Sequence, residues 1–266
     1  MKTHTFAIIG CGKLANIVVD ALIDNMLPEY ELIGCYSRTF NSAEKLATRV
    51  NNNVENYACK PCKTIDELFQ LKPKYIVETA TPNSLKNWGI NALKNGSSII
   101  TLSIGAFSDD TFKNEMKQTA EKYNTRIHIA SGAIGGLDIL RTASLFEDCE
   151  VSFTSIKGAH RLKKLDLYDK KLEKEKREVF RGNAKEAIEL LPTGINVAVA
   201  TALASVGTEK LDVSVHSVPD FKDDEHIIEL SSDTIKAEID IFSSTSKLAG
   251  WSIVSTMRNI QAPITF

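Results

Sequence analysis

The stretch Phe6-Ala7-Ile8-Ile9-Gly10-Cys11-Gly12-Lys13-Leu14-Ala15 decides the fold of this chain. Its first four residues form a continuous apolar run, which is typical of a strand buried on both faces of a parallel sheet. Two glycines follow at once, and from Leu14 to Ile23 the apolar residues recur at helical spacing. The stretch therefore predicts a strand, a glycine turn and a helix, in that order.

This order favours a phosphate-binding turn. Gly10 allows the tight turn, and without a Cβ at Gly12 a pyrophosphate can approach the backbone. The free N–H groups at the start of the helix then face the anion. Ala15 is the small residue that the dinucleotide fingerprint accepts in place of a third glycine. The pattern predicts a dinucleotide site, although an ordinary strand-to-helix turn would also fit it.

The end of the second predicted strand bears on which dinucleotide binds. Residues 31–36 are mostly apolar, and Ser37 and Arg38 follow them. An NAD-preferring site usually carries an acid near this position, which accepts the ribose 2′-hydroxyl. A hydroxyl beside a guanidinium suits a 2′-phosphate instead, so the sequence favours NADP over NAD. The alternative is that Arg38 only flanks the adenine or faces water.

Strands and helices alternate up to residue 131, which is the pattern of a Rossmann-type, doubly wound α/β fold with a parallel sheet. We expect residues 51–53 to end the second helix and residues 54–58 to form a short third strand. In such sheets ligands bind beyond the carboxyl ends of the strands. Glu78, at one of these ends, is either a solvated loop acid or part of the site. Three loops are expected at the cofactor, at residues 10–15, 78–82 and 103–106.

The pattern changes after the first domain, residues 1–131, and we expect a second α/β domain over residues 132–245. Residues 161–181 are rich in charge and predict an exposed excursion. The last helix, within residues 246–266, is expected to return to the first domain. Three later strands are expected to form a mainly antiparallel sheet, at residues 211–217, 226–230 and 235–242.

The composition is that of an ordinary globular protein. The chain has 266 residues, of which 43% are hydrophobic and 25% charged, and a net charge of -2. A net charge this close to zero does not indicate a nucleic-acid-binding protein. No apolar run approaches the ~20 residues that a membrane-spanning helix needs. The first five residues lead directly into the first strand, which leaves no room for a signal peptide.

The cysteines indicate a reduced, cytoplasmic protein, because their number is odd and several fall in or beside predicted buried strands. Cys59 and Cys62 are the one candidate metal-binding pair. A structural zinc would need a second pair of Cys or His ligands at suitable spacing, which the sequence lacks. We therefore expect no bound metal.

Several stretches along almost the whole chain resemble the L-aspartate dehydrogenase family. The most specific is Ser131-Gly132-Ala133-Ile134-Gly135-Gly136-Leu137-Asp138. The others are Gly10–Ala15, Val77–Pro82, Leu102–Ala106, Ile195–Ala198 and His226–Ile228. Enzymes of this family form iminoaspartate for the quinolinate route of NAD biosynthesis.

The resemblance implies a Rossmann domain closed by the C-terminal helix, and a second domain whose sheet forms the interface of a homodimer or homotetramer. It also implies that His226 is the catalytic histidine and that Ala133 and Asn196 contact the cofactor. With the glycine turn and the strand-end loops, the predicted cofactor contacts are Gly10, Cys11, Gly12, Lys13, Leu14, Ser37, Arg38, Ala80, Thr81, Ser103, Ala133 and Asn196.

The implied substrate is a small amino acid. A dicarboxylate needs a cation or N–H donors, and Lys157 is one candidate. His226 could hold the substrate or act as an acid or base, since the unperturbed pKa of a histidine lies near neutral pH. Asp224 is the second substrate candidate, and in an extended strand it would share a face with His226 and raise the pKa of the imidazole.

The chain departs from the family's usual pattern in three places. Asp224 stands where the family commonly has Asn, Lys157-Gly158-Ala159 where it often has Lys-Pro-Pro, and Ser37 where it often has Asp. The first two departures leave open a reductase of another amino, imino or semialdehyde acid. The third departure, Ser37 in place of Asp, bears on whether the preferred cofactor is NAD or NADP. A non-enzymatic redox sensor that binds a dinucleotide is the remaining alternative.

Overall fold

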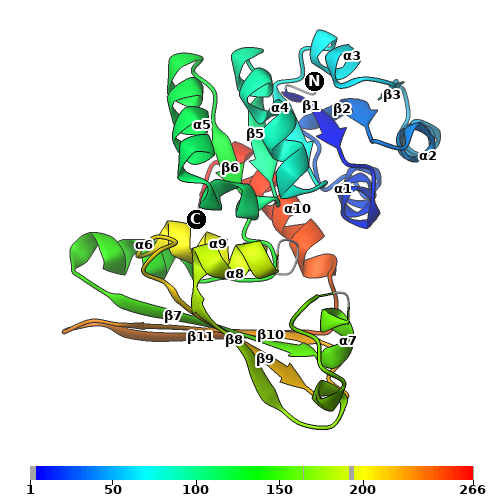
Figure 1. Cartoon of the computed structure of the whole chain (residues 1–266). Coiled ribbons are helices and arrows are strands. Elements are labelled where there is room, and N and C mark those ends of the chain that lie inside the picture. Colours follow the sequence, from blue (N-terminus) through cyan, green and yellow to red (C-terminus); the bar gives the residue numbers. More distant parts are fainter. Residues whose placement is uncertain (1–3, 164, 192–194, 266) are drawn as a thin grey trace. The chain divides into compact units, whose positions relative to one another are not determined.

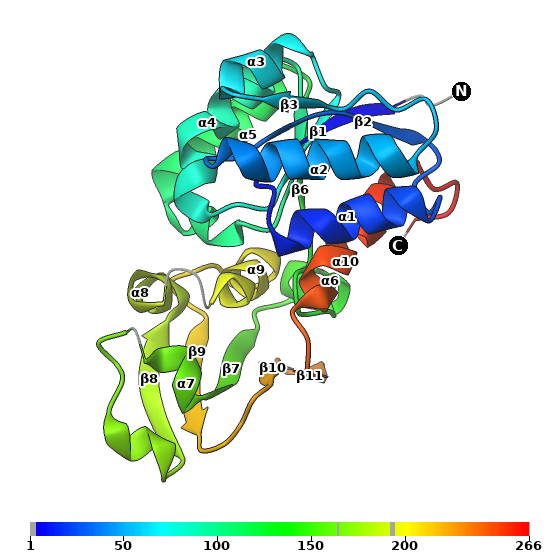
Figure 2. The same ribbon diagram turned by 90° about the vertical axis from the view of Figure 1, so that its right-hand side faces the viewer.

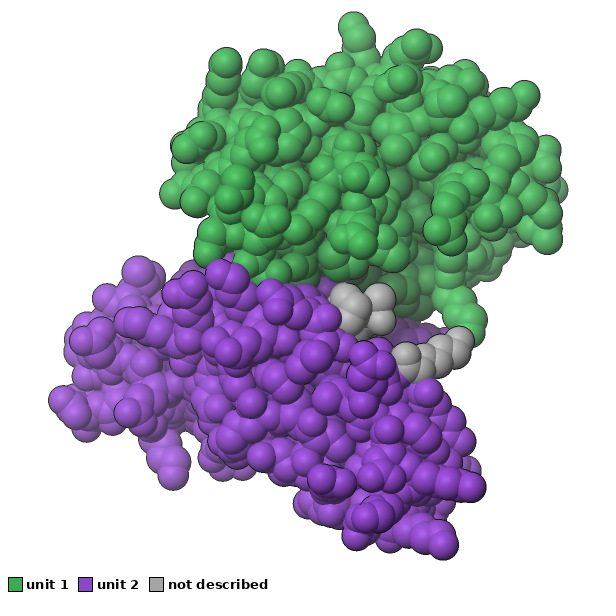
Figure 3. Space-filling view, viewed as in Figure 1, with its two compact units in different colours: residues 1–132, 249–266 green, residues 133–248 purple. Residues whose placement is uncertain are grey.

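The computed structural model describes residues 4–163, 165–191 and 195–265. The chain forms two compact units (Figure 3). The first contains the chain up to Gly132 together with the segment from Ala249, and the second runs from Ala133 to Leu248. The residues before His4, which entered the expectation that no signal peptide is present, lie outside the described ranges.

A six-stranded parallel sheet forms the centre of the first unit (Figure 1). Its spatial order is β3-β2-β1-β4-β5-β6, so the direction of winding reverses between β1 and β4. This is the predicted doubly wound topology, which places a ligand at the reversal point. The strands are β1 (His4–Ile9), β2 (Tyr30–Tyr36), β3 (Lys60–Cys62), β4 (Tyr75–Glu78), β5 (Ser98–Thr101) and β6 (Ile127–Ile129).

Helices connect these strands, and several begin where local sequence favours it. Thr64 accepts a hydrogen bond from the Glu67 N–H at the start of α3, and Thr81 does the same for α4, whose first residue is Pro82. The helical segments of this unit are α1 (Lys13–Ile23), α2 (Phe40–Asn53), α3 (Ile65–Gln70), α4 (Pro82–Lys94), the 3₁₀ turn η1 (Ile104–Ser108), α5 (Asp110–Lys122) and α10 (Lys247–Gln261).

The last helix, α10, shares the core of the first unit. Ile253 and Met257 belong to the same buried cluster as Phe6 of β1. The Tyr30 hydroxyl donates a hydrogen bond to the Met257 carbonyl at 2.7 Å. A Cβ on Gly250 would lie 2.5 Å from the side chain of Ile17, so the glycine lets α10 approach α1 closely.

The second unit is a five-stranded mixed sheet in the order β11-β10-β7-β9-β8. Only β7 and β9 pair in parallel, and the other pairs are antiparallel. Helices α6, α8 and α9 lie against one face, called the helix-covered face below (Figures 1 and 2). The elements are α6 (Leu137–Phe146), β7 (Glu150–Gly158), α7 (Ala159–Leu162), η2 (Lys170–Glu173), β8 (Arg177–Asn183), α8 (Ala184–Leu190), α9 (Asn196–Ala204), β9 (Asp212–Val218), β10 (Asp224–Ser231) and β11 (Lys236–Ser243).

Two sequence expectations about these elements were wrong. Residues 51–53 form the last turn of α2, because the Asn51 side chain bonds both the N–H and the carbonyl of Cys59 instead of ending the helix. The third strand is β3, a few residues after the expected 54–58, where it pairs with β2. The charged excursion at residues 161–181 is mostly exposed, as expected, and its last residues belong to β8, a sheet-edge strand where charged side chains are tolerated.

The described part of the chain contains no helix long and apolar enough to cross a membrane. Within the same residues, no group of three or more His, Cys, Asp or Glu side chains could hold a metal ion. All five cysteines are free thiols, and four of them are buried.

Candidate active site

The glycine turn packs directly against the loop after β4. Gly10 has φ +101°, and a Cβ there would lie 2.8 Å from the backbone of Thr79 and Ala80. The Thr79 hydroxyl donates to the Gly10 carbonyl at 2.5 Å, and the Gly10 N–H donates to the Tyr36 carbonyl at 2.9 Å. Only glycine accommodates both this φ and this contact, so Gly10 fixes the two loops side by side.

The start of α1 fits a dinucleotide phosphate. A Cβ on Gly12 would meet no atom within 4 Å, so the space in front of this residue is open. Gly12 is also the N-cap of α1, and no side chain caps the helix there. Backbone N–H groups at such a terminus bind anions. The arrangement therefore provides the unobstructed approach that a pyrophosphate requires.

A pocket of about 520 Å³ opens over this turn. Seven of the predicted cofactor contacts line it: Gly10, Cys11, Gly12, Ser37, Arg38, Ala80 and Thr81. The sequence interpretation missed ten further lining residues: Ile9, Tyr36, Thr39, Ser42, Ile65, Thr79, Asn83, Ser84, Asn87 and Trp88. Ile9, Tyr36, Thr39 and Thr79 end or closely follow strands β1, β2 and β4, and four others lie in the first turns of α4: Asn83, Ser84, Asn87 and Trp88. The strand-end rule identifies the former directly.

The other five predicted cofactor contacts are not among the residues that line the pocket. Lys13 and Leu14 are the first residues of α1. Ser103 is buried, and its hydroxyl donates to Glu78 at 2.8 Å. Ala133 is half-buried just after Gly132, and Asn196 is the first residue of α9. The last two belong to the second unit.

Glu78 is an internal anchor of the cofactor loops. Its side chain is 0% exposed and accepts hydrogen bonds from the Ala80 N–H, the Thr101 hydroxyl and both the N–H and hydroxyl of Ser103, at 2.6–3.1 Å. Burial raises the pKa of the carboxyl, and these hydrogen bonds oppose the rise. Glu78 is therefore neither a solvated acid nor a residue that lines the pocket. Its hydrogen bonds connect the loops after β4 and β5.

His226 lies on the helix-covered face of the second sheet. It is 4% exposed, and its ring stacks on Phe153 with centroids 5.5 Å apart. Its Nδ1 atom is buried and has no hydrogen-bond partner among the described residues. Burial, reinforced by the charge of Lys157, lowers the pKa of His226 to about 4, and Asp224 only partly opposes this. The expectation of an imidazole pKa near neutral pH was wrong, because desolvation outweighs the carboxylate.

Asp224 is held by two cations. Its carboxylate lies 3.5 Å from the Lys157 ammonium and 2.9 Å from the Arg161 guanidinium. Burial lowers the pKa of Lys157, and the charge of Asp224 opposes that shift. The two cations and one anion leave a net positive charge beside a neutral imidazole. Such a group of side chains can hold a carboxylate and receive a proton.

Two family models together match most of the chain. Residues 10–130 match the NAD binding domain of homoserine dehydrogenase. Residues 138–260 match the C-terminal domain of aspartate dehydrogenase. The second match contains both Lys157 and His226.

Individual proteins match over the whole length. L-aspartate dehydrogenase of Methanococcus maripaludis strain C5 is 30% identical over 266 residues, which cover 97% of each chain. The crystal structure of aspartate dehydrogenase from Thermotoga maritima aligns over 99% of both chains, with a TM-score of 0.75 and 28% identity. Dihydrodipicolinate reductase from a Paenisporosarcina species shares the fold, with a TM-score of 0.57 and 14% identity. This chain belongs to the L-aspartate dehydrogenase family.

Proposed function

We propose that this protein is an L-aspartate dehydrogenase that uses a nicotinamide dinucleotide. It oxidises L-aspartate to iminoaspartate, which water hydrolyses to oxaloacetate and ammonium, and the first product supplies NAD biosynthesis. The observation that carries the proposal is the 30% identity to an L-aspartate dehydrogenase across 97% of each chain. The open glycine turn and the cationic group around His226 support it independently.

The chemistry requires a proton acceptor and a carboxylate holder. When bound, the cofactor accepts the hydride that leaves Cα. Before that step, the substrate ammonium must lose one proton, so that the nitrogen lone pair can form the C=N bond. His226 suits this task, since burial keeps the ring unprotonated in the free protein and a bound carboxylate would raise its pKa towards the working pH. Lys157 suits a substrate carboxylate, with Asp224 as the positioning residue for its ammonium.

The proposal assigns one role to each unit. The first, expected as the dinucleotide-binding domain with its returning C-terminal helix, binds the cofactor through the pocket-lining residues. The second binds the substrate through Lys157 and His226. Lys13, Leu14, Ser103, Ala133 and Asn196 complete the proposed cofactor contacts.

NADP is the proposed preferred cofactor. Ser37 and Arg38 line the pocket directly after β2, and Arg38 is exposed. A carboxylate at the position of Ser37 would repel a 2′-phosphate, whereas a guanidinium attracts it. The described pocket lining contains no acidic residue.

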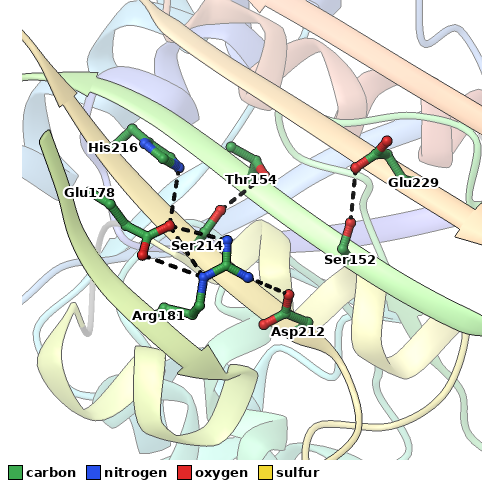
Figure 4. Close-up of polar contacts among 8 residues, drawn as sticks. All are labelled: Ser152, Thr154, Glu178, Arg181, Asp212, Ser214, His216 and Glu229. Carbon is green, nitrogen blue, oxygen red and sulfur yellow. Dashed lines mark hydrogen bonds and ion pairs between the residues drawn. The ribbon is translucent and has the colours of Figure 1, made fainter. Parts of the chain in front are cut away.

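We also propose that the protein is a homodimer or homotetramer that works in the cytoplasm. The face of the second sheet opposite the helices carries side chains that pair along the surface (Figure 4). Arg181 bonds Glu178 and Asp212 at 3.1 and 2.9 Å, and the Ser214 and Thr154 hydroxyls lie 3.0 Å apart. A sheet face that α6, α8 and α9 leave uncovered (Figures 1 and 2) and that carries these side chains suits a second copy of the chain. The free thiols are consistent with a reducing compartment.

A substrate screen tests the function. Amino acids and the corresponding keto acids with ammonia are offered with NAD and with NADP, and absorbance of the reduced nicotinamide is followed. We expect L-aspartate and oxaloacetate to be the best pair. Faster turnover of another amino, imino or semialdehyde acid would contradict the assignment. Dinucleotide binding without turnover of any substrate would instead indicate a sensor.

A further inference from the structure

Polar side chains interrupt the apolar helix-covered face of the second sheet at one end. The strands β9, β7 and β10 lie side by side, and their paired residues form rows across this face. One row, Val213–Phe153–Ile228, is apolar and fully buried. The next two rows are Val215–Ser155–His226 and Ser217–Lys157–Asp224. Five of these six positions carry polar side chains, which we call the polar rows.

The register brings these side chains into contact distance of one another. Ser155 lies directly opposite His226, and Lys157 lies directly opposite Asp224, in the antiparallel pair of β7 and β10. Such opposite residues have Cβ atoms about 4.5–5.5 Å apart. Ser217 is the partner of Lys157 in the parallel pair of β7 and β9. The polar rows are therefore one cluster, built from three neighbouring strands.

Three polar atoms of this cluster lack a hydrogen bond. Ser155 and Ser217 are each 0% exposed, and neither hydroxyl has a partner among the described residues. The Nδ1 atom of His226 is the third. A buried hydroxyl without a partner costs stability relative to an apolar group of the same shape. Native proteins pair nearly all such groups, so two unpaired hydroxyls in one cluster call for a partner from outside the described residues.

The charge of the cluster selects the ligand. Lys157 and Arg161 together exceed the single charge of Asp224, so the cluster is cationic. The two serine hydroxyls can donate hydrogen bonds, and both stand next to Lys157 or one row away. Two hydroxyl donors beside an ammonium match the oxygens of a carboxylate. An amino dicarboxylic acid, which carries one net negative charge, complements the cluster.

We propose that Ser155 and Ser217 are substrate-binding residues whose hydroxyls hold a carboxylate of the amino dicarboxylic acid beside Lys157. This inference rests on the proposed function for the identity of the substrate. It adds two residues that hold the substrate and take no part in proton transfer. It also gives a reason for leaving two hydroxyls unpaired in the free protein.

The variants Ser155→Ala and Ser217→Ala separate a binding role from a structural one. Each removes an unpartnered hydroxyl, so the free variants should unfold at the same temperature as the wild type or higher. Each should also raise the KM for L-aspartate about tenfold or more, since a hydrogen bond to a charged group is lost. The value of kcat should change only a few-fold, and the Kd of NADP should not change.

Succinate provides a readout that does not depend on turnover. It is a dicarboxylate without an amino group, and it should raise the melting temperature of the wild-type protein. That rise should be smaller in both serine variants. If wild-type protein binds succinate but does not oxidise L-aspartate, the proposed function fails and the inference about the serines stands.

Ser214→Ala is the matched control. Ser214 lies on β9, as Ser217 does, but on the opposite face, where its hydroxyl is paired with Thr154 (Figure 4). This variant should lower the melting temperature slightly and leave the KM for L-aspartate unchanged. An unchanged KM and an unchanged succinate effect in Ser155→Ala and Ser217→Ala would overturn the inference. A loss of stability in the free variants, equal to that of Ser214→Ala, would also overturn it.

Discussion

Glu78 in the first unit and the polar rows in the second bury polar groups in opposite ways. In the first, Glu78 is fully buried, and four hydrogen bonds from its own loops satisfy it. In the second, Ser155, Ser217 and His226 are buried with polar atoms that have no partner in the described part of the chain. A satisfied group holds structure together, whereas an unsatisfied group costs stability until a ligand completes it. The difference separates anchoring residues from candidate binding residues.

The same difference extends to how each unit meets its ligand. The glycine turn offers backbone N–H groups and exposed side chains around an open pocket. Its geometry is set before the cofactor arrives, because Gly10, Thr79 and Glu78 fix the loops. The polar rows instead offer buried side chains whose register is fixed but whose hydrogen bonds are incomplete. The following predictions test this comparison.

Removing the satisfied anchor should have the largest effect. Glu78→Ala leaves the N–H groups of Ala80 and Ser103 and the Thr101 hydroxyl without their acceptor, so the free energy of unfolding should fall by roughly 3–5 kcal/mol. Trp88 and Trp251, the chain's two tryptophans, both lie in the first unit, so their fluorescence during denaturant unfolding reports on this change. Glu78→Gln keeps one acceptor oxygen and should lose less. Equal stability of Glu78→Ala and wild type would remove the anchoring role.

His226 should make the stability of the second unit depend on pH. Its pKa is about 4 in the folded protein, below the ordinary value of 6.5, so the unfolded chain binds the extra proton between these values. Stability should therefore rise with pH from about 4 to 6.5, by about 3 kcal/mol, and stay level above that range. The comparison is wild type against His226→Gln, by circular dichroism in denaturant. The carboxylates contribute equally to the pH dependence of both proteins. If stability changes with pH in the same way in wild type and His226→Gln, the claim that the ring is buried in its unprotonated form is wrong.

Loss of the imidazole should reduce turnover of L-aspartate. General acid–base catalysis contributes at least about 100-fold, so His226→Ala should lower kcat by that factor, equivalent to about 2.7 kcal/mol, with the Kd of NADP nearly unchanged. His216→Ala is the matched control, because His216 lies on the opposite face of β9, beside Glu178, and β7 separates that strand from β10 (Figure 4). It should stay within a few-fold of wild type. Equal kinetics for the two variants would exclude His226 from the mechanism.

The smallest expected change concerns cofactor choice. Arg38→Ala should shift the ratio of NADP to NAD affinity by about tenfold, the loss of one charge-assisted contact to a 2′-phosphate. Arg126→Ala is the control, since this exposed residue precedes β6 at the opposite end of the strands. Calorimetric titration with both dinucleotides gives the ratio directly. If the ratio of NADP to NAD affinity is unaltered in Arg38→Ala, the Arg38 guanidinium does not contact the 2′-phosphate and instead flanks the adenine or faces solvent.

The sequence predicted the first unit well because its signals are local. A strand, a glycine turn and a helix follow one another within the first 23 residues, and the residues after β2 and β4 line the pocket as the strand-end rule requires. The errors there involve pairing at a distance. Nothing near residues 54–58 shows that Asn51 bonds Cys59, or that β2 takes Lys60 as its partner.

The polar rows could not be predicted, because the register between strands creates them. Ser155 follows Val151 and Phe153 on one face of β7, so the alternation alone marks it as a polar residue in an apolar series. Its position opposite His226 is a property of the pairing with β10. The lowered pKa of His226 depends on burial and on Lys157, which lies 69 positions away in the sequence. The need for glycine at Gly158 also depends on a contact distant in sequence, since a Cβ there would lie 1.9 Å from the Phe221 carbonyl.

The most direct test of the polar rows as the substrate site is the titration of the His226 ring by NMR, with the signal assigned by its loss in His226→Gln. In the free protein the ring should titrate near the folded-state pKa of about 4. With saturating succinate its signal should shift and its pKa should rise, because a bound anion favours the imidazolium. A ring that titrates at the ordinary value of 6.5 and does not respond to succinate or L-aspartate would contradict the account.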